Sequence, residues 1–325
     1  MKKQSKIWIM TACSLVLFGL IIFGGAMTVM GWDFSKLSTN NYETNYYDID
    51  DSFSDISILI DTADITFLPA EDRKCSVVCF EEVRSKHSVS VKDGVLSISL
   101  EDTRKWYDHI GIFNLKTPKI TVYIPRGGYG TLFIKGSTGD ILIPQDFIYN
   151  SIDISQSTGD VTNYAPTYDS IKIRTSTGNI CVENVTAKGI DLAVSTGHIT
   201  VSNAICSGSV SLSVSTGKCH IKDLECKEFN STGSTGDVSM ADVIAVGMIS
   251  VERSTGDVKL DSCDAGEISV TTDTGDVTGS LLTDKVFITQ TDTGRVNVPE
   301  TTSGGKCRIF TDTGDIQIEI VPNNS

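Results

Sequence analysis

Aspartate in the tripeptide Asp-Thr-Gly is the residue type in this sequence that could do chemistry, because the same tripeptide surrounds the catalytic carboxylate of aspartic proteases. It occurs three times, at Asp273, Asp292 and Asp312. A protease of that kind needs two such turns face to face, so that two carboxylates share one proton. Three copies spaced 19 and 20 residues apart indicate a repeat instead of a dyad. We therefore predict turns and no catalytic residues at these positions.

Seven copies of the related tripeptide Ser-Thr-Gly keep this spacing upstream, from Ser137 to Ser254, so that ten glycines recur every 19 or 20 residues. Glycine alone adopts positive φ without steric cost, so each is predicted to form the turn between two strands. These predicted turn glycines are Gly139, Gly159, Gly178, Gly197, Gly217, Gly236, Gly256, Gly275, Gly294 and Gly314.

Apolar and polar residues alternate on both sides of each tripeptide, as at Ile152 and Ile154 before one copy and Ile180 and Val182 after the next. Period-two alternation is typical of a half-buried strand. A third apolar position, nine residues after the tripeptide start and near Asn, Asp or Gly, is predicted as a far corner. One such unit cannot bury its apolar row alone, whereas stacked units share a core. The predicted fold class is all-β, a β-solenoid (β-helix) of 19–20-residue rungs.

Residues 7–30 form an uncharged apolar run of 24 residues, which as a helix reaches about 36 Å and can span a bilayer core of about 30 Å. We predict a transmembrane helix, which makes the cell's own membrane a partner. Lys2, Lys3 and Lys6 precede the run, so residues 1–6 are placed in the cytoplasm and the remainder outside, in a single-pass protein. The alternative is a signal peptide cleaved near Gly24-Gly25-Ala26, although the run exceeds the usual apolar length of such peptides.

The predicted domains follow from these patterns. Residues 31–51 are expected to be an extracellular linker, residues 52–130 an irregular β region that caps the solenoid, and residues 131–321 the solenoid with its ten repeats. Asp61-Thr62-Ala63 resembles a decayed repeat, which suggests that the cap continues the coil. The final rung ends with little sequence beyond it, so open strand edges there suggest a hypothesis of dimerisation.

The charge of the chain bears on its partners. There are 41 acidic and 27 basic side chains, and three of the basic ones lie before residue 7, so the exported part carries a formal charge of −17. Such a surface disfavours nucleic acid as a partner.

Two metal chemistries can be considered. Asp237, Asp257 and Asp276 follow successive turns, and calcium bridging this column together with Asp273 would relieve their repulsion. The alternative is that these carboxylates simply splay into solvent and are screened by salt, with no cofactor. Cys75 and Cys79 lie on one face of an expected strand, but no matching Cys/His pair of zinc-site spacing follows, so zinc is not predicted.

The order of an apolar helix, "DISILIDTADITFLPA", "DGVLSISLED" and "ITVYIPRGGYGTLFIKGSTGDI", followed by repeated S-T-G-D-[IV], resembles the bacterial toast-rack or "putative adhesin" domains of unknown function. The resemblance covers about residues 50–320. It implies a right-handed β-helix displayed outside the cell membrane, with some relatives linked to envelope-stress signalling modules and no catalytic residues to carry over.

The expected function is therefore that of a non-enzymatic, membrane-anchored extracellular scaffold. It would act as an accessory or sensor in cell-envelope stress signalling, with neighbouring membrane signalling proteins or cell-wall components as partners. An adhesin-like surface binding module is the alternative. A polysaccharide-acting enzyme is a remote one, because the short period leaves almost no insertions with which to build a cleft.

Overall fold

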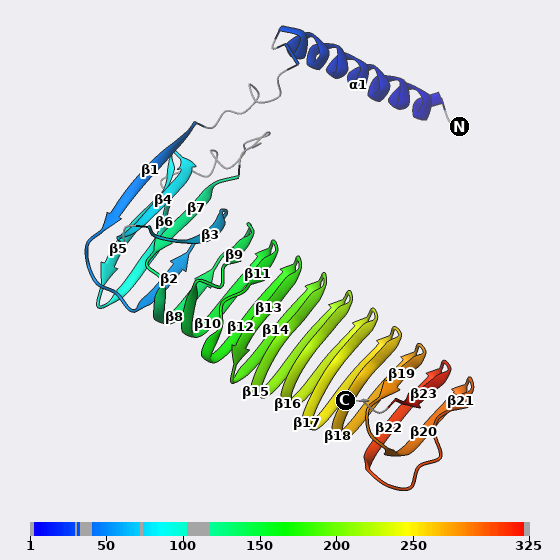
Figure 1. Cartoon of the computed structure of the whole chain (residues 1–325). Coiled ribbons are helices and arrows are strands. Elements are labelled where there is room, and N and C mark those ends of the chain that lie inside the picture. Colours follow the sequence, from blue (N-terminus) through cyan, green and yellow to red (C-terminus); the bar gives the residue numbers. More distant parts are fainter. Residues whose placement is uncertain (1–2, 30, 33–40, 72–73, 103–116, 322–325) are drawn as a thin grey trace.

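The structure is a computed structural model that describes residues 3–29, 31–32, 41–71, 74–102 and 117–321. Within these residues one helix, α1 (Lys3–Val29), precedes 23 strands that join one sheet wound into an elongated solenoid (Figure 1). The predicted all-β class, with a β-solenoid and one N-terminal apolar helix, is confirmed.

From Trp8 onward, the helix α1 is apolar enough for a lipid environment. Residues Trp8–Val29 form a 22-residue stretch with a mean hydropathy of 2.2, and large side chains such as Leu15 and Ile21 are exposed. At about 1.5 Å per residue this stretch is long enough to cross a bilayer core. A signal peptide near an N-terminus has the same properties, so the helix fits either role.

Each repeat folds into one rung whose strands pair in parallel with those of the neighbouring rungs. Before the tripeptide, Ile171 lies in register between Ile152 and Ile190, one repeat away on either side, and all three are buried. Segments after the tripeptide pair in the same way. Equivalent apolar positions therefore stack into one continuous core. The strands of this part are β8 (Gly127–Lys135), β9 (Ile141–Ile143), β10 (Phe147–Thr158), β11 (Val161–Asn163), β12 (Thr167–Thr177), β13 (Ile180–Ala187), β14 (Gly189–Thr196), β15 (Ile199–Thr216), β16 (Cys219–Thr235), β17 (Val238–Thr255), β18 (Val258–Thr274) and β19 (Val277–Leu281).

A bend in each of five successive rungs forms the far corner. One residue there has a left-handed backbone, with φ between 49° and 57°, and it directly precedes the buried third apolar position of the repeat. Asn and Asp tolerate this conformation better than most residues, which explains the composition of the corner. The five residues are Asn184, Asn203, Asp223, Asp242 and Ser262.

The stack continues toward the N-terminus beyond the first Ser-Thr-Gly. Strands β2 (Asp55–Leu59) and β3 (Asp64–Pro69) pair with β8 and β9, and Thr62 of the Asp-Thr-Ala sequence bridges Thr138. On their other side lie β6 (Val95–Asp102) and β7 (Lys119–Ile124). The decayed repeat is thus one more turn in the same column.

Antiparallel strands cover this end. β4 (Cys75–Glu82) lies between β7 and β1 (Tyr42–Ile49), and β5 (Ser85–Lys92) pairs with β6. The prediction of a linker over residues 31–51 is therefore wrong for residues 42–49. Alternation of Tyr with polar residues indicated a stalk, but every second side chain of β1 is partly buried, and Tyr47 and Ile49 pack against the core.

The order of the rungs is exchanged at the C-terminal end. The last two rungs consist of β20 (Lys285–Thr293) with β21 (Val296–Asn297), and β22 (Gly305–Thr313) with β23 (Ile316–Ile320). β22 pairs with both β18 and β20, and β23 pairs with both β19 and β21. The final rung of the chain is thus inserted between its two predecessors.

Burial explains this order. The inward residues of the inserted rung include Cys307, Ile309, Ile316 and Ile318, all buried. The rung before it places Phe287, Thr289 and Thr291 inward on β20, none of them fully buried, and its β21 has only two residues. The more apolar rung therefore lies between two other rungs, and the more polar rung lies at the solvent-exposed end of the stack. The expectation that the three Asp-Thr-Gly turns stack in chain order, and that the last rung has the open edges, is wrong. Among the described strands at this end, β20 and β21 pair on one side only.

Candidate functional site

The tripeptide turns form one column along the solenoid. All ten predicted turn glycines have positive φ, between 125° and 156°. A Cβ placed on any of them would lie 1.7–2.3 Å from a backbone carbonyl oxygen of the next turn in the stack. The turn amides donate across rungs, as from Gly159 N to Thr177 O at 2.9 Å. Glycine is needed here for both its backbone freedom and its lack of a side chain.

The three Asp-Thr-Gly aspartates lie along one edge of this column. Their rungs are neighbours in the order Asp273, Asp312, Asp292, because Thr274, Thr313 and Thr293 are in register. All three carboxylates are exposed. Parallel side chains along an edge do not form the opposed pair that an aspartic protease uses.

The residue after each glycine forms a second feature, a ladder of acceptors. In seven of the nine steps between these ten residues, a carboxylate or amide oxygen accepts a hydrogen bond from the backbone N–H of the equivalent residue one rung on, at 2.7–3.2 Å. An eighth step uses the Nδ1 of His198 as acceptor for Lys218 N. Asp64 begins the ladder by accepting from Asp140 N. In spatial order the column is Asp64, Asp140, Asp160, Asn179, His198, Lys218, Asp237, Asp257, Asp276, Asp315 and Arg295.

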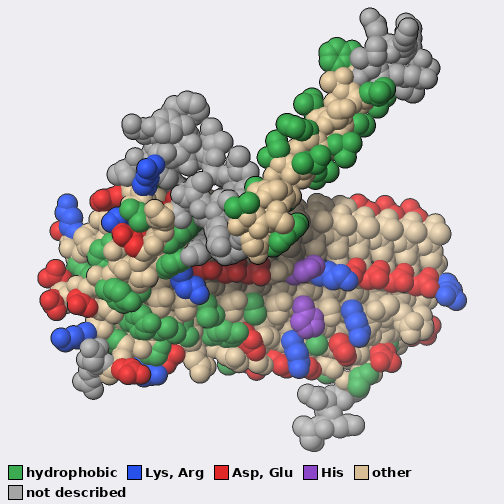
Figure 2. Space-filling view, turned by 90° about the horizontal axis from the view of Figure 1, so that it is seen from above, with side chains coloured by type: hydrophobic (Ala, Val, Ile, Leu, Met, Phe, Trp, Pro, Cys, Tyr) green, Lys and Arg blue, Asp and Glu red, His purple; other side chains and the backbone are tan. Residues whose placement is uncertain are grey.

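The ladder accounts for the residue types in this column. Asp, Asn and His all carry an acceptor, whereas Lys218 carries none and instead forms an ion pair with Asp237 at 2.8 Å. This contact, together with the amide of Asp257, lowers the pKa of the Asp237 carboxyl. Arg295 also lacks an acceptor, but it lies at the exchanged end of the stack, where no further described rung requires one. Figure 2 shows the row of acidic side chains, interrupted by histidine and lysine.

The predicted calcium ligands are part of this arrangement. Asp237 and Asp257 each use an oxygen to accept the next backbone amide, as does Asp276. Asp273 is exposed on the same turn as Asp276. Calcium bridging of these four side chains remains a prediction.

Replacing Asp257 separates the two explanations. Asp257→Ala removes the acceptor for Asp276 N, and we expect the free energy of unfolding to fall by about 1 kcal/mol. Asp257→Asn keeps an acceptor oxygen and should unfold like the wild type in urea, with or without calcium. A calcium-dependent melting temperature that Asp257→Asn abolishes would instead favour a bound cation.

A buried cluster of ionisable side chains lies away from this column, in the N-terminal antiparallel strands. Cys79 and Glu81 on β4 and His87 on β5 are all buried, and one ligand atom of each lies within 4.8 Å of the others. The Nδ1 of His87 is 2.5 Å from Glu81 Oε2, which also accepts from the backbone N of His87 at 2.6 Å. Asn45 on β1 donates to Glu81 Oε1 at 2.7 Å.

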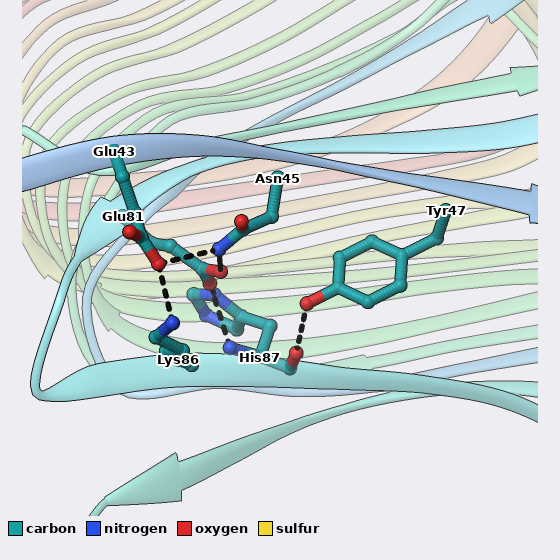
Figure 3. Close-up of polar contacts among 6 residues, drawn as sticks. All are labelled: Glu43, Asn45, Tyr47, Glu81, Lys86 and His87. Carbon is teal, nitrogen blue, oxygen red and sulfur yellow. Dashed lines mark hydrogen bonds and ion pairs between the residues drawn. The ribbon is translucent and has the colours of Figure 1, made fainter.

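Neighbours of this cluster tie β1 to β5. Figure 3 shows Asn45 and Tyr47 pointing from β1 toward His87, and the Tyr47 hydroxyl donates to the His87 carbonyl at 2.8 Å. Lys86 pairs with Glu43 at 2.5 Å nearer the surface. Burial, followed by the charge of Glu81, raises the pKa of Cys79 to about 12, and the same two causes raise that of Tyr47 to about 12.

One buried atom of the cluster, His87 Nε2, makes no hydrogen bond to any residue that the structure describes. A buried polar atom without a partner costs about 1–3 kcal/mol, so such an atom calls for an explanation. Motif spacing does not reveal this cluster, because no second Cys/His pair of zinc-site spacing follows Cys75 and Cys79. Glu81 follows Cys79 on the same face of β4, and the β4–β5 hairpin brings His87 beside both. The alternation C-x-E on one strand face was the available signal.

The cysteines are all unpaired in the structure, and all nine lie in described residues. Cys219 contacts a buried cation, because Arg253 donates to its Sγ and to Ser231 Oγ within the core. Gly233 leaves room for this arginine. Four other solenoid cysteines, Cys206, Cys226, Cys263 and Cys307, pack in the apolar core. Burial raises the thiol pKa of each of them, to about 12 at Cys226.

Stacked parallel rungs, one conserved turn geometry per repeat and an antiparallel end together define a β-solenoid repeat protein. The chain belongs to the Toastrack DUF4097 family, whose model matches residues 53–211 and 205–325. Curated proteins include no significant sequence match.

Three solved structures are similar to this chain at low sequence identity. A "putative adhesin" from Parabacteroides distasonis is 13% identical over 87% of this chain and 98% of its own, with a TM-score of 0.45. A "putative adhesin" from Bacteroides fragilis is 14% identical over 86% and 97%, with a TM-score of 0.40. A "putative lipid binding protein" from P. distasonis is 17% identical over 74% and 95%, with a TM-score of 0.42. At these values none of the three bears on what this chain binds.

Proposed function

We propose that the chain is a non-enzymatic scaffold, anchored in the cell membrane by α1 and carrying a rigid extracellular solenoid that binds neighbouring membrane proteins. The observation that carries the proposal is the combination of an apolar helix with a stack of in-register rungs. At about 4.8 Å per rung, the eleven turns from Asp61-Thr62-Ala63 onward extend over roughly 50 Å.

The role in envelope-stress signalling, as a sensor or an accessory, is the finer part of this proposal. It is supported by the short segment between α1 and β1, which keeps the solenoid close to its own membrane. A non-enzymatic role is supported by the turn carboxylates, which are exposed in a row or engaged with backbone amides. The alternative is an adhesin-like module that binds cell wall or foreign cells.

In-cell photo-crosslinking of the full-length protein tests the proposal. Photoreactive residues would be placed at exposed solenoid positions such as Ile205 and Val246, and captured proteins identified by mass spectrometry. We expect membrane proteins of the same cell. A matched version with α1 replaced by an unrelated single-span helix should capture the same partners, because the solenoid is the binding element. Capture of wall polymer or foreign-cell components alone would favour adhesion and contradict the proposal.

A further inference from the structure

The buried cluster of Cys79, Glu81 and His87 lies where three strands of the N-terminal cap meet. Cys79 and Glu81 are two residues apart on β4, so both side chains project from the same face of that strand. His87 reaches them from β5 across the hairpin, and Asn45 reaches Glu81 from β1. No part of this cluster belongs to the turn column or to the repeated core positions.

The three side chains offer sulfur, nitrogen and oxygen donors. Thiolate, imidazole and carboxylate are the ligand types that bind zinc, and ligand atoms around tetrahedral zinc are about 3–4 Å apart. The donor atoms here already lie within 4.8 Å of one another, so small side-chain rotations would bring them to that spacing. Sites with three protein ligands commonly complete the tetrahedron with water.

Two further observations point to a cation. Among the residues that the structure describes, the buried His87 Nε2 has no hydrogen-bond partner, and an unprotonated ring nitrogen is a metal ligand. Glu81 is fully buried, and among the described residues its side chain hydrogen-bonds to His87 and Asn45, while Lys86 acts on it only at longer range. In the metal sites of other proteins, a carboxylate or amide beside the ligands holds them in position, as Asn45 holds Glu81 here.

We propose that Cys79, Glu81 and His87 bind one divalent transition-metal ion of the zinc class. The Cys79 thiol loses its proton to solvent as its sulfur binds the ion, and the Glu81 carboxylate and a His87 ring nitrogen complete the protein ligands. The ion joins β4 to β5 directly and β1 through Asn45, so it acts as a structural clamp on the end of the solenoid that follows the membrane helix.

Metal titration of the full-length protein in detergent tests this assignment. The protein is stripped with a chelator, and Co²⁺ is added as a spectroscopic substitute for zinc. We expect one equivalent to bind, with the near-ultraviolet charge-transfer absorption of a cobalt–thiolate bond, and Zn²⁺ to displace it and raise the melting temperature.

Single substitutions identify the ligands. Cys79→Ser should abolish the charge-transfer absorption, and His87→Gln or Glu81→Gln should weaken Co²⁺ affinity at least tenfold. Cys75→Ser is the matched control, because Cys75 is buried on the same face of β4 but lies outside the cluster, so its absorption should match the wild type. Stoichiometric binding without the absorption, or absorption that survives Cys79→Ser, would overturn the proposal. So would a folded, stripped wild-type protein that binds no Co²⁺, a result that requires no variant.

Discussion

Gly217→Ala is expected to lower the free energy of unfolding by about 4 kcal/mol or more, which is at the upper end of single-residue effects. The φ of Gly217 is 138°, where a side chain is strained, and its Cβ would lie 1.7 Å from the carbonyl oxygen of Gly197. Backbone atoms of the neighbouring rung cannot rotate away as a side chain can. These two rungs must therefore separate, and the turn hydrogen bond between them, from Gly197 N to Thr216 O at 3.0 Å, is lost.

Gly189→Ala is the matched control. Gly189 begins β14 in the same solenoid, its φ is not positive, and the nearest atom to an added Cβ is 4.0 Å away. Urea unfolding of the full-length protein in detergent should give a value within about 0.5 kcal/mol of the wild type. Equal stabilities for the two variants would mean that the turns do not stack as described.

The second large effect is expected at the centre of the solenoid. Phe229 is 1% exposed and lies in register between Val210 and Ile249 of the adjacent rungs. Phe229→Ala leaves a cavity that rungs on both sides hold open, so we expect a loss of about 3–5 kcal/mol in the free energy of unfolding. Val246→Ala, at a side chain that is 81% exposed, should change it by less than about 0.5 kcal/mol. A loss below 1 kcal/mol for Phe229→Ala would show that the rung interior is loosely packed.

The regular part of this fold could be predicted from the sequence because its constraints are local and repeated. Glycine spacing of 19 or 20 residues sets the rung length, and period-two alternation identifies which side chains face inward. The ladder was visible only in part. Asp140 and Asp160 could be placed in one column, but the acceptance of a backbone amide by each side chain is a property of three-dimensional register.

The two ends could not be predicted in the same way because their contacts are not repeated. The sequence of β1 alone is typical of a polar stalk. Its burial comes from pairing with β4, where Tyr42 stacks on Phe80 with ring centroids 5.2 Å apart. The buried cluster depends on the same antiparallel pairing. At the C-terminal end, chain order suggested one stacking sequence, and burial of the more apolar rung produced another.

The exchanged order of the last two rungs determines how the ladder ends, because it places Arg295 at the end of the ladder and Asp315 within it. Disulfide trapping tests it directly. In the structure Ser269 is in register with Arg308, which is in register with Ile288 on its other side. Adjacent rungs lie about 4.8 Å apart, within reach of a disulfide, whereas rungs two steps apart are about 10 Å apart and out of reach.

Two double variants of the full-length protein, Ser269→Cys with Arg308→Cys and Ser269→Cys with Ile288→Cys, would be oxidised under native conditions and their disulfides mapped by peptide mass spectrometry. We expect the Ser269→Cys and Arg308→Cys pair, on adjacent rungs, to form a disulfide, and the Ser269→Cys and Ile288→Cys pair, two rungs apart, to form none. Disulfide formation by the second pair alone would show that the rungs stack in chain order and would contradict the account.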